Sequence, residues 1–395
     1  MDKRSREQEN TTEKKRKKPN FLTRILLFLL AIALLLCGIT AIAYRDRLSM
    51  DSIRRWFHYR SLILNDSGQA ESFIYDGDAN DTFASLDGDL LVCSRNAISL
   101  YSGSGTCYVS QPVSMENPVV DSNGTTAVVY DAGGSSLYVL GQRQLIWKTD
   151  ELSSILSAHL NRNGQLTVVT QPGGYRGVVT VYSAACEPLM RIDLSSAFVM
   201  DAALSDNGKT LSILTIGQES GAFTSTLALY TLNTAGSGQF TPDRTSSLNS
   251  DVIIATRHSD NAVWSLGNQG LYVTDHRGNT VTTDWSDRYL KRYTLDGQNF
   301  AAALLGLYRA GSQAELITVD SSGTVHSVDY DEQILALAAA GRYVAVLTGD
   351  RLDIYTSDLT LYNSLEGTQG ARNVLLMKDG SAILISNESA NFYVP

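Results

Sequence analysis

The sequence has few of the residues from which common catalytic sites are built. Its 395 residues include only five His and four Cys. It contains no HExxH or CxxC metal motif, no GxSxG nucleophile turn, no phosphate-binding P-loop and no GxGxxG segment after an expected strand. We therefore predict no catalytic residue, no metal site and no cofactor, and we interpret the chain as a non-enzyme.

The four cysteines predict no structural disulfide. Cys93 and Cys107 fall on the second and fourth strands of one expected sheet, which places them two strand spacings or roughly 10 Å apart. A disulfide cannot span that separation without distortion. Cys37 lies in an apolar run, and Cys186 has no evident mate.

Charged residues are also scarce, at 18% of the chain, and they are unevenly divided. Residues 1–60 carry 14 Lys and Arg against 6 Asp and Glu, a net charge of +8. Residues 61–395 carry 18 against 35, a net charge of −17. A globular part this acidic has no basic stripe to neutralise phosphates, so nucleic acid is excluded as a partner.

The amino-terminal residues predict a membrane anchor. Residues 1–24 form a basic tail without apolar periodicity, which we expect to be disordered. Residues 25–43 are uncharged and mostly Leu, Ile and Ala, and at 1.5 Å per residue they form about 28 Å of helix, enough to span a bilayer. A signal peptide cleaved after Ala41-Ile42-Ala43 is the alternative, but its apolar run would be unusually long.

The charges on either side of this span predict its orientation. Nine Lys and Arg precede the span, and five follow it closely. By the positive-inside rule the N-terminus lies in the cytoplasm and the rest of the chain outside. Residues 44–65 are expected to form a juxtamembrane stalk or interfacial helix, with Trp56 and Tyr59 at the level of the lipid headgroups.

A tight turn ending in Gly or Asn recurs through the remaining three quarters of the chain. After seven of the eight turns comes a strand with an apolar residue followed by Tyr, as in Leu100-Tyr101. Successive turns are 36 to 53 residues apart, which is typical of four-stranded propeller blades. The turns are Asp87-Gly88, Asn123-Gly124, Asn163-Gly164, Asn207-Gly208, Asp260-Asn261, Asp296-Gly297, Ala340-Gly341 and Asp379-Gly380.

These repeats predict an all-β fold, an eight-bladed β-propeller over residues 66–395. The eighth repeat supplies only three strands before the chain ends. We expect the segment 71–75 to provide the missing outer strand of the last blade and so to close the ring, since closure protects strand edges that would otherwise pair with other chains. A seven-bladed ring with the weak sixth repeat absorbed as an insertion is the alternative.

Long loops between second and third strands indicate a binding face. Tyr and Arg are favoured anchors of protein interfaces, and a propeller places all such loops on one face. Three of these loops, in repeats three, four and six, combine aromatic with charged residues. The predicted partner-binding residues are Tyr175, Arg176, Phe223, Tyr308 and Arg309.

The whole plan resembles a known class of proteins. The repeats resemble WD40-like and quinoprotein-like propellers of bacteria, and the basic tail, the span and Arg54-Arg55-Trp56-Phe57 are similar to a family of membrane-anchored propellers of Gram-positive bacteria with no assigned activity. The Gly-His and Trp-Asp marks of true WD40 repeats are missing, as is the adjacent cysteine pair of quinone-dependent dehydrogenases. The resemblance implies a fold and a location without a reaction.

Together these observations favour a membrane-anchored, extracytoplasmic propeller that acts as a protein-interaction or scaffold module at the cell envelope. The expected partner is a protein, and the expected membrane contact is the span at 25–43. The alternative is an envelope enzyme, a redox protein or a ligand sensor that uses the central funnel of the propeller.

Overall fold

The computed structural model describes residues 51, 55, 59–60, 62–77, 81–219, 221–232, 241–248, 251–259 and 262–395. The predicted basic tail, the predicted span, most of the predicted stalk and the turn Asp260-Asn261 lie outside the described residues. Among the residues that are described, no helix is long and apolar enough to cross a membrane. The chain divides into two units, 1–56 and 57–395, and the following account concerns the second.

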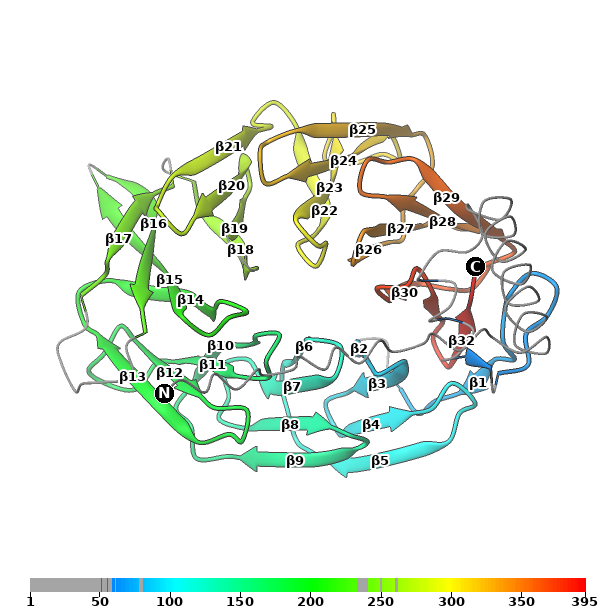
Figure 1. Ribbon diagram of the computed structural model, residues 1–395, viewed down its shortest axis with the longest axis horizontal. Coiled ribbons are helices and arrows are strands. Elements are labelled where there is room, and N and C mark those ends of the chain that lie inside the picture. Colours follow the sequence, from blue (N-terminus) through cyan, green and yellow to red (C-terminus); the bar gives the residue numbers. More distant parts are fainter. Residues whose placement is uncertain are drawn as a thin grey trace, which may run out of the picture. The chain divides into compact units, whose positions relative to one another are not determined.

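Residues 57–395 form eight four-stranded antiparallel sheets arranged as the blades of a propeller (Figure 1). The strands of blades 1 to 4 are β2 (Thr82–Leu86), β3 (Asp89–Cys93), β4 (Ala97–Tyr101) and β5 (Cys107–Pro112); β6 (Pro118–Ser122), β7 (Thr126–Asp131), β8 (Leu137–Gly141) and β9 (Gln144–Thr149); β10 (Ile155–Leu160), β11 (Leu166–Thr170), β12 (Gly177–Tyr182) and β13 (Pro188–Leu194); and β14 (Phe198–Leu204), β15 (Thr210–Glu219), β16 (Ala222–Thr231) and β17 (Arg244–Ser247).

The other four blades have the same plan. Their strands are β18 (Ile253–His258), β19 (Ala262–Gly267), β20 (Gly270–Asp275) and β21 (Thr280–Asp284); β22 (Tyr289–Thr294), β23 (Phe300–Gly306), β24 (Ala314–Asp320) and β25 (Val325–Tyr330); β26 (Ala336–Ala340), β27 (Tyr343–Leu347), β28 (Arg351–Thr356) and β29 (Leu361–Glu366); and β30 (Asn373–Leu376), β31 (Ala382–Ile385) and β32 (Ser389–Tyr393) with β1 (Phe73–Ile74).

The number of blades confirms the eight-bladed prediction. The sixth repeat, which lacks the apolar-Tyr pair, nevertheless forms a complete sheet from β22 to β25. Its strands are short and rich in apolar and β-branched residues, so the blade forms without the Tyr. The seven-bladed alternative, in which this repeat is an insertion, is wrong.

The predicted closure of the ring is confirmed as well. Strand β1 pairs antiparallel with β32, with Phe73 opposite Ala390 and Ile74 opposite Ser389. The closing strand is only two residues long, shorter than the expected segment 71–75. Phe73 is buried and its ring lies 6.1 Å from the ring of Tyr101 in blade 1, so the closing strand also joins the last blade to the first.

A separate hydrophobic cluster lies between each pair of neighbouring blades, the pair of blades 8 and 1 included. This follows from the sequence, because the central strands of a blade are apolar on both faces and one blade cannot cover both of its own faces. The recurring Tyr contributes to these clusters. Tyr101, Tyr230, Tyr272, Tyr355 and Tyr393 are buried, and the hydroxyls of Tyr330 and Tyr355 lie 2.8 Å apart.

The ring has two distinct ends. In blades 1 to 7 the strands follow chain order from the central channel outward, and in blade 8 the strands β30, β31 and β32 do so with β1 outermost (Figure 1). The loops from second to third strands and the connections between blades lie at one end, which we call the loop end. The turns from first to second and from third to fourth strands lie at the other, which we call the turn end.

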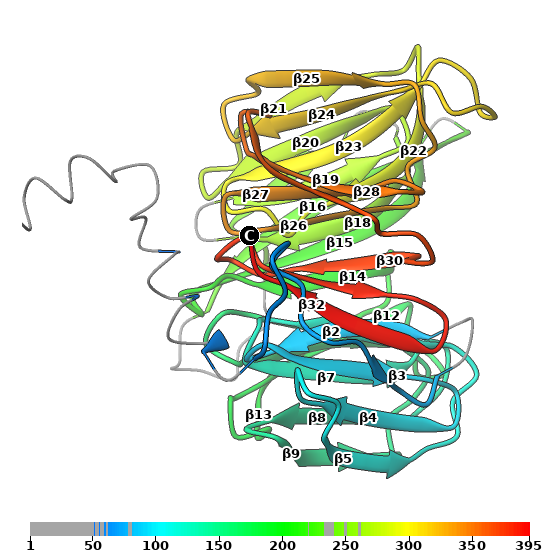
Figure 2. The ribbon, with the colours of Figure 1, turned by 90° about the vertical axis from the view of Figure 1, so that its right-hand side faces the viewer.

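The chain reaches the propeller at the turn end. Gln69 bridges to Tyr393, and the hydroxyl of Tyr59 lies 2.8 Å from the hydroxyl of Ser381, in the turn between β30 and β31. Figure 2 shows this part of the chain, in blue, beside β32. Tyr59 is buried against Phe392, so our expectation that it lies at the lipid headgroups is wrong. Its ring gains more from the apolar cluster of blade 8 than from an exposed position.

The closing strand offers a direct test with an adjacent control. Phe73→Ala should lower the free energy of unfolding by about 3 to 5 kcal/mol, because it leaves a cavity between blades 8 and 1. Ile74→Ala, at a side chain that is 80% exposed, should change it by less than about 0.5 kcal/mol. Melting curves of the two full-length variants decide the matter. Equal melting temperatures would show that β1 does not hold the ring closed.

Candidate functional site

The predicted partner-binding residues all lie at the loop end, as expected from the propeller topology. Tyr175 stands in the loop between β11 and β12, and Tyr308 and Arg309 stand in the loop between β23 and β24. Tyr175, Phe223 and Tyr308 are 41%, 61% and 67% exposed. These three aromatic rings therefore contribute little to the core and are available to a partner.

The two predicted arginines stack on aromatic rings of inner strands. The guanidinium carbon of Arg176 lies 4.5 Å from the ring centroid of Phe198 at the start of β14, and Arg176 Nε donates to the carbonyl of Ser195. The guanidinium carbon of Arg309 lies 5.9 Å from the ring centroid of Tyr289 at the start of β22. Stacking of this kind holds a guanidinium flat and leaves its edge free for a carboxylate or carbonyl.

The predicted long loop of repeat four, from Glu219 to Phe223, is instead the tip of a hairpin. Strands β15 and β16 are ten residues long and stay paired up to the pair of Glu219 and Ala222, so Phe223 is a strand residue opposite Gln218. The hairpin continues well past the length of the other second and third strands. Its Thr and Phe residues favour strand over loop, and Phe223 is presented on this projecting hairpin.

The loop end also carries several exposed apolar residues that the sequence did not predict. Together with the three predicted aromatics they form what we call the apolar half-face. Its members are Tyr175, Phe198, Met200, Phe223, Ile254, Tyr289, Leu307 and Tyr308, all exposed. All belong to blades 3 to 6. The other exposed large apolar side chains among the described residues lie on outermost strands or at residues 63 and 64, apart from Tyr293 on β22.

Irregular strand pairing explains part of this arrangement. The inner strands of blades 3, 4, 5 and 6 each break register with the second strand near their start, at Leu156, Met200, Ile254 and Lys291. A bulge places one extra residue opposite its partner strand and turns a side chain away from the regular face. Met200 and Ile254 are exposed for this reason. No register break is recorded for the described inner strands of the other four blades.

A cluster of charged residues occupies the inner strands near the turn end. Arg257 on β18 donates to Asp121 on β6 at 2.6 Å, and its other terminal nitrogen lies 3.5 Å from Asp296. His159 on β10 contacts Asp201 on β14 at 3.0 Å. Blades 2 and 5 are not neighbours, so the pair of Arg257 and Asp121 crosses the central channel. We call these five residues the axial charge cluster.

The electrostatics of this cluster are those of a paired network. Burial alone would raise the pKa of Asp121, but Arg257 and His159 hold it well below its usual range. Burial alone would lower the pKa of His159, but Asp201 and Asp121 raise it from 6.5 to about 10. His159 is therefore a cation at neutral pH. Asp121 is stabilised as an anion by two cations, and the cluster links the inner strands of blades 2 to 6.

No three His, Cys, Asp or Glu residues are placed to hold a metal ion in the described part of the chain. Cys93 and Cys107 are free thiols on β3 and β5, the strands on which we expected them.

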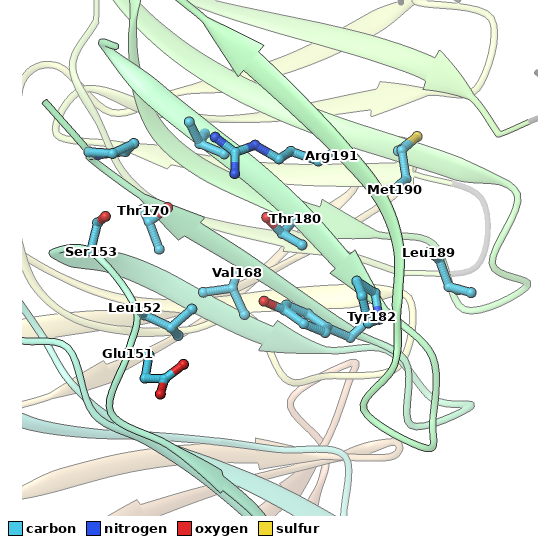
Figure 3. A pocket seen from close by; sticks show the side chains of 13 residues that line it. Glu151, Leu152, Ser153, Val168, Thr170, Thr180, Tyr182, Leu189, Met190 and Arg191 are labelled. Carbon is cyan, nitrogen blue, oxygen red and sulfur yellow. The ribbon is translucent and has the colours of Figure 1, made fainter. Parts of the chain in front are cut away.

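A groove of about 520 Å³ follows the face of blade 3 beside the connection from blade 2. Figure 3 shows Glu151 and Leu152 on one side, with Thr170, Thr180 and Tyr182 on the strands. The ring of Tyr182 lies 5.6 Å from that of Trp147, so blades 2 and 3 are in contact there. The groove lies on the outer side of the ring, away from the axial charge cluster.

Comparison with known proteins agrees with the fold. The sequence matches a family model described as a family of unknown function (DUF5711) over residues 68–391, which runs from before β1 into β32. The C-terminal WD40 domain of Sif2 is similar with a TM-score of 0.57 and 14% identity, covering 83% of this chain and 98% of that domain. Apo AztD from Citrobacter koseri is similar with a TM-score of 0.50 and 12% identity, covering 82% and 93%.

At these identities the two structures show a shared WD40-like propeller fold and nothing further. No curated protein sequence matches the chain. The resemblance to WD40-like propellers is thus confirmed for the fold, while the features specific to membrane-anchored proteins of Gram-positive bacteria stay a prediction.

The axial charge cluster predicts a pH dependence of stability. Because the pKa of His159 is raised from 6.5 to about 10, its contribution is complete below pH 6.5 and is lost as the pH rises through about 10. At pH 6, His159→Gln should lose about 1.5 to 3 kcal/mol, the contribution of a hydrogen bond to a charged group. The difference in melting temperature from wild type should shrink steadily between pH 6.5 and 10.

His326→Gln is the matched control for this prediction. His326 is an exposed residue of β25, so its replacement should give a melting curve that follows wild type at every pH. A difference between His159→Gln and wild type that stays constant from pH 6 to 10 would contradict the assignment of His159 as a cation.

Proposed function

The chain belongs to the DUF5711 family, whose function is unknown, and we propose that its propeller is a non-catalytic protein-interaction module whose partner binds the apolar half-face. The observation that carries the proposal is the gathering of eight exposed large apolar side chains at one end of four neighbouring blades. Burial of apolar surface contributes about 25 cal/mol per Å², and aromatic rings contribute most per residue.

The composition of the half-face supports a protein as the partner. Five of its eight members are Tyr or Phe, and the rings of two of these, Phe198 and Tyr289, lie beneath the guanidiniums of Arg176 and Arg309. Aromatic residues and Arg are the commonest anchors of protein interfaces, and they cluster where a partner excludes water. Five of the eight side chains, those of Phe198, Met200, Phe223, Ile254 and Tyr289, stand on strands, which lowers the entropy lost on binding.

The path of the chain also favours a protein, and not a lipid surface, as the partner of the half-face. Residues 59 to 69 meet the propeller at the turn end, whereas the half-face lies at the loop end. If residues 25–43 span the membrane, the half-face is carried on the end of the ring opposite to the one where the chain arrives.

Membrane anchoring and an envelope location are part of the proposal. Their support is the apolar run at 25–43 together with the charges of +8 in residues 1–60 and −17 in residues 61–395. In this arrangement the N-terminus is cytoplasmic and the propeller extracytoplasmic.

The alternative, an enzyme, redox protein or ligand sensor that uses the central funnel, has less support. The ionisable side chains that cross the channel are already paired with one another in the axial charge cluster. A catalytic acid or base needs a free face toward its substrate.

Replacement of the aromatics of the half-face tests the proposal. A triple variant with Ser at Tyr175, Phe223 and Tyr308 should retain its melting temperature, since exposed substitutions usually cost under about 0.5 kcal/mol each. Loss of interface anchors should weaken partner binding by about 30-fold or more. Crosslinking on cells followed by purification of the full-length chain gives the yield of crosslinked partner. Arg176 is kept, because it also holds the carbonyl of Ser195.

A control variant carries Ser at Tyr108, Ile146 and Leu361, which are also exposed but lie on outermost strands. It should recover the same partners at wild-type yield. If the two triple variants recover partners equally well, the binding surface lies elsewhere.

The orientation is tested separately. Protease added to intact cells should degrade the chain beyond about residue 60 and spare the basic tail, because only the tail is then cytoplasmic. An antibody against each end of the chain reads out the fragments. A propeller that survives until the cells are lysed would refute the extracytoplasmic location.

A further inference from the structure

A second region of the loop end is basic instead of apolar. The inner strands β22, β26 and β30 of blades 6, 7 and 8 lie beside the central channel (Figure 1). Residues of these strands, and of the chain just before β26 and β30, line a pocket of about 430 Å³. We call it the basic mouth. It is lined by Lys291, Arg292, Tyr293, Leu335, Ala336, Leu337, Arg372 and Asn373. Three of these residues are cations, and none carries a carboxylate.

The positive charge of the basic mouth is not compensated within the described residues. Lys291 Nζ donates to the carbonyls of Gly311 at 2.6 Å and Gln313 at 3.3 Å, and Arg292 Nε donates to the carbonyl of Ile334 at 3.3 Å. The Arg372 side chain is exposed. All these acceptors are neutral, so the three cations form no ion pair with any described carboxylate.

Not every cation of the chain lacks a carboxylate partner. Residues 61–395 contain 35 Asp and Glu against 18 Lys and Arg, and several other arginines form ion pairs with these carboxylates. Arg143 pairs with Asp89, Arg257 with Asp121, and Arg351 with Asp353. A group of unpaired cations in a concave site, surrounded by an acidic body, focuses positive potential in that site.

Local structure explains the positions of Lys291 and Arg292. Lys291 is the extra residue of the bulge in β22, and the bulge turns its side chain out of the regular strand pattern. Its stem then passes across Gly306, where a Cβ would lie 2.1 Å from Lys291 Cε. Glycine is required there for the ammonium to reach the carbonyls of the next loop. Arg292 follows directly and bridges from blade 6 to blade 7.

The remaining walls are apolar. Tyr293 is exposed within the pocket, and Leu335 and Leu337 are partly buried beside it. Ligand sites are typically pockets of about 300 to 1,000 Å³ with apolar walls and a few convergent polar groups, and the basic mouth meets that description. Guanidinium groups favour planar oxyanions such as carboxylate and phosphate.

We propose that the basic mouth binds a small anion bearing carboxylate or phosphate groups, with its apolar part against Tyr293 and Leu337. Arg292 and Arg372 supply the hydrogen bonds from two different blades, and Lys291 adds a third positive charge. This site goes beyond the proposed protein-binding function, and its test needs no protein partner.

Titration calorimetry of the full-length chain in detergent tests the proposal with two probes, pyrophosphate and citrate, at constant ionic strength set with chloride. At least one probe should bind saturably, and its affinity should fall as the ionic strength rises. Binding of pyrophosphate alone supports a phosphate ligand, binding of citrate alone supports a carboxylate ligand, and binding of both supports the shared chemistry.

The double variant Arg292→Gln with Arg372→Gln should weaken binding by at least tenfold. Arg277→Gln, which removes one positive charge from an exposed turn of blade 5 and so matches the single variant Arg372→Gln, should bind like wild type. If the double variant melts at a lower temperature than wild type, Arg372→Gln alone is the test variant, because the exposed side chain of Arg372 makes no described hydrogen bond. This single variant should weaken binding by about threefold or more. The proposal is overturned if neither probe binds wild type saturably, or if Arg277→Gln weakens binding as much as the pocket variants.

Discussion

Closure of the ring is the constraint on which the rest of the structure depends. Each blade has apolar residues on both faces of its central strands, so each face must be covered by a neighbouring blade. The pairing of β1 with β32 supplies the last cover and leaves a hydrophobic cluster at every junction between blades. It also brings residues 59 to 70 against the turn end of blade 8, where Tyr59 and Phe73 become part of the core.

Within the closed ring, the inner strands of blades 3 to 6 are bulged, and this irregular pairing distinguishes that half of the ring from the other. Regular pairing would direct alternate side chains of an inner strand toward the neighbouring blades. The extra residues Met200, Ile254 and Lys291 leave that pattern, and all three are found in the candidate sites of the loop end. The same irregularity thus produces exposed apolar side chains in blades 4 and 5 and a half-buried cation in blade 6.

The sequence predicted the features that depend on composition and repetition. Turn residues, the apolar-Tyr pair and the short last repeat were enough for the eight blades and for the closing strand near Phe73. The predicted loop aromatics were found at the loop end for the same reason, since topology alone decides which end a loop occupies.

What the sequence did not predict depends on exact register. The residues of the axial charge cluster stand at different distances from the following turn: Asp121 is two residues before Asn123, whereas Asp201 is six before Asn207. Part of the difference comes from the bulge at Met200 and part from the longer turn between β14 and β15, and no residue type marks a bulge reliably. The burial of Tyr59 was missed because it depends on packing against Phe392 and Ser381, which are distant in the sequence. The length of the β15 and β16 hairpin was missed because the residues near its tip were taken for a loop.

The two candidate sites at the loop end share one structural element. Lys291 belongs to the basic mouth, and its ammonium holds the carbonyls of Gly311 and Gln313 in the loop that carries Tyr308 and Arg309. An anion that took up this ammonium would compete with those carbonyls for its three N–H groups. Because Arg309 also stacks on Tyr289, two residues before Lys291, the loop is tied to β22 at both sites. Occupancy of the basic mouth and the shape of the apolar half-face are therefore connected through a single strand.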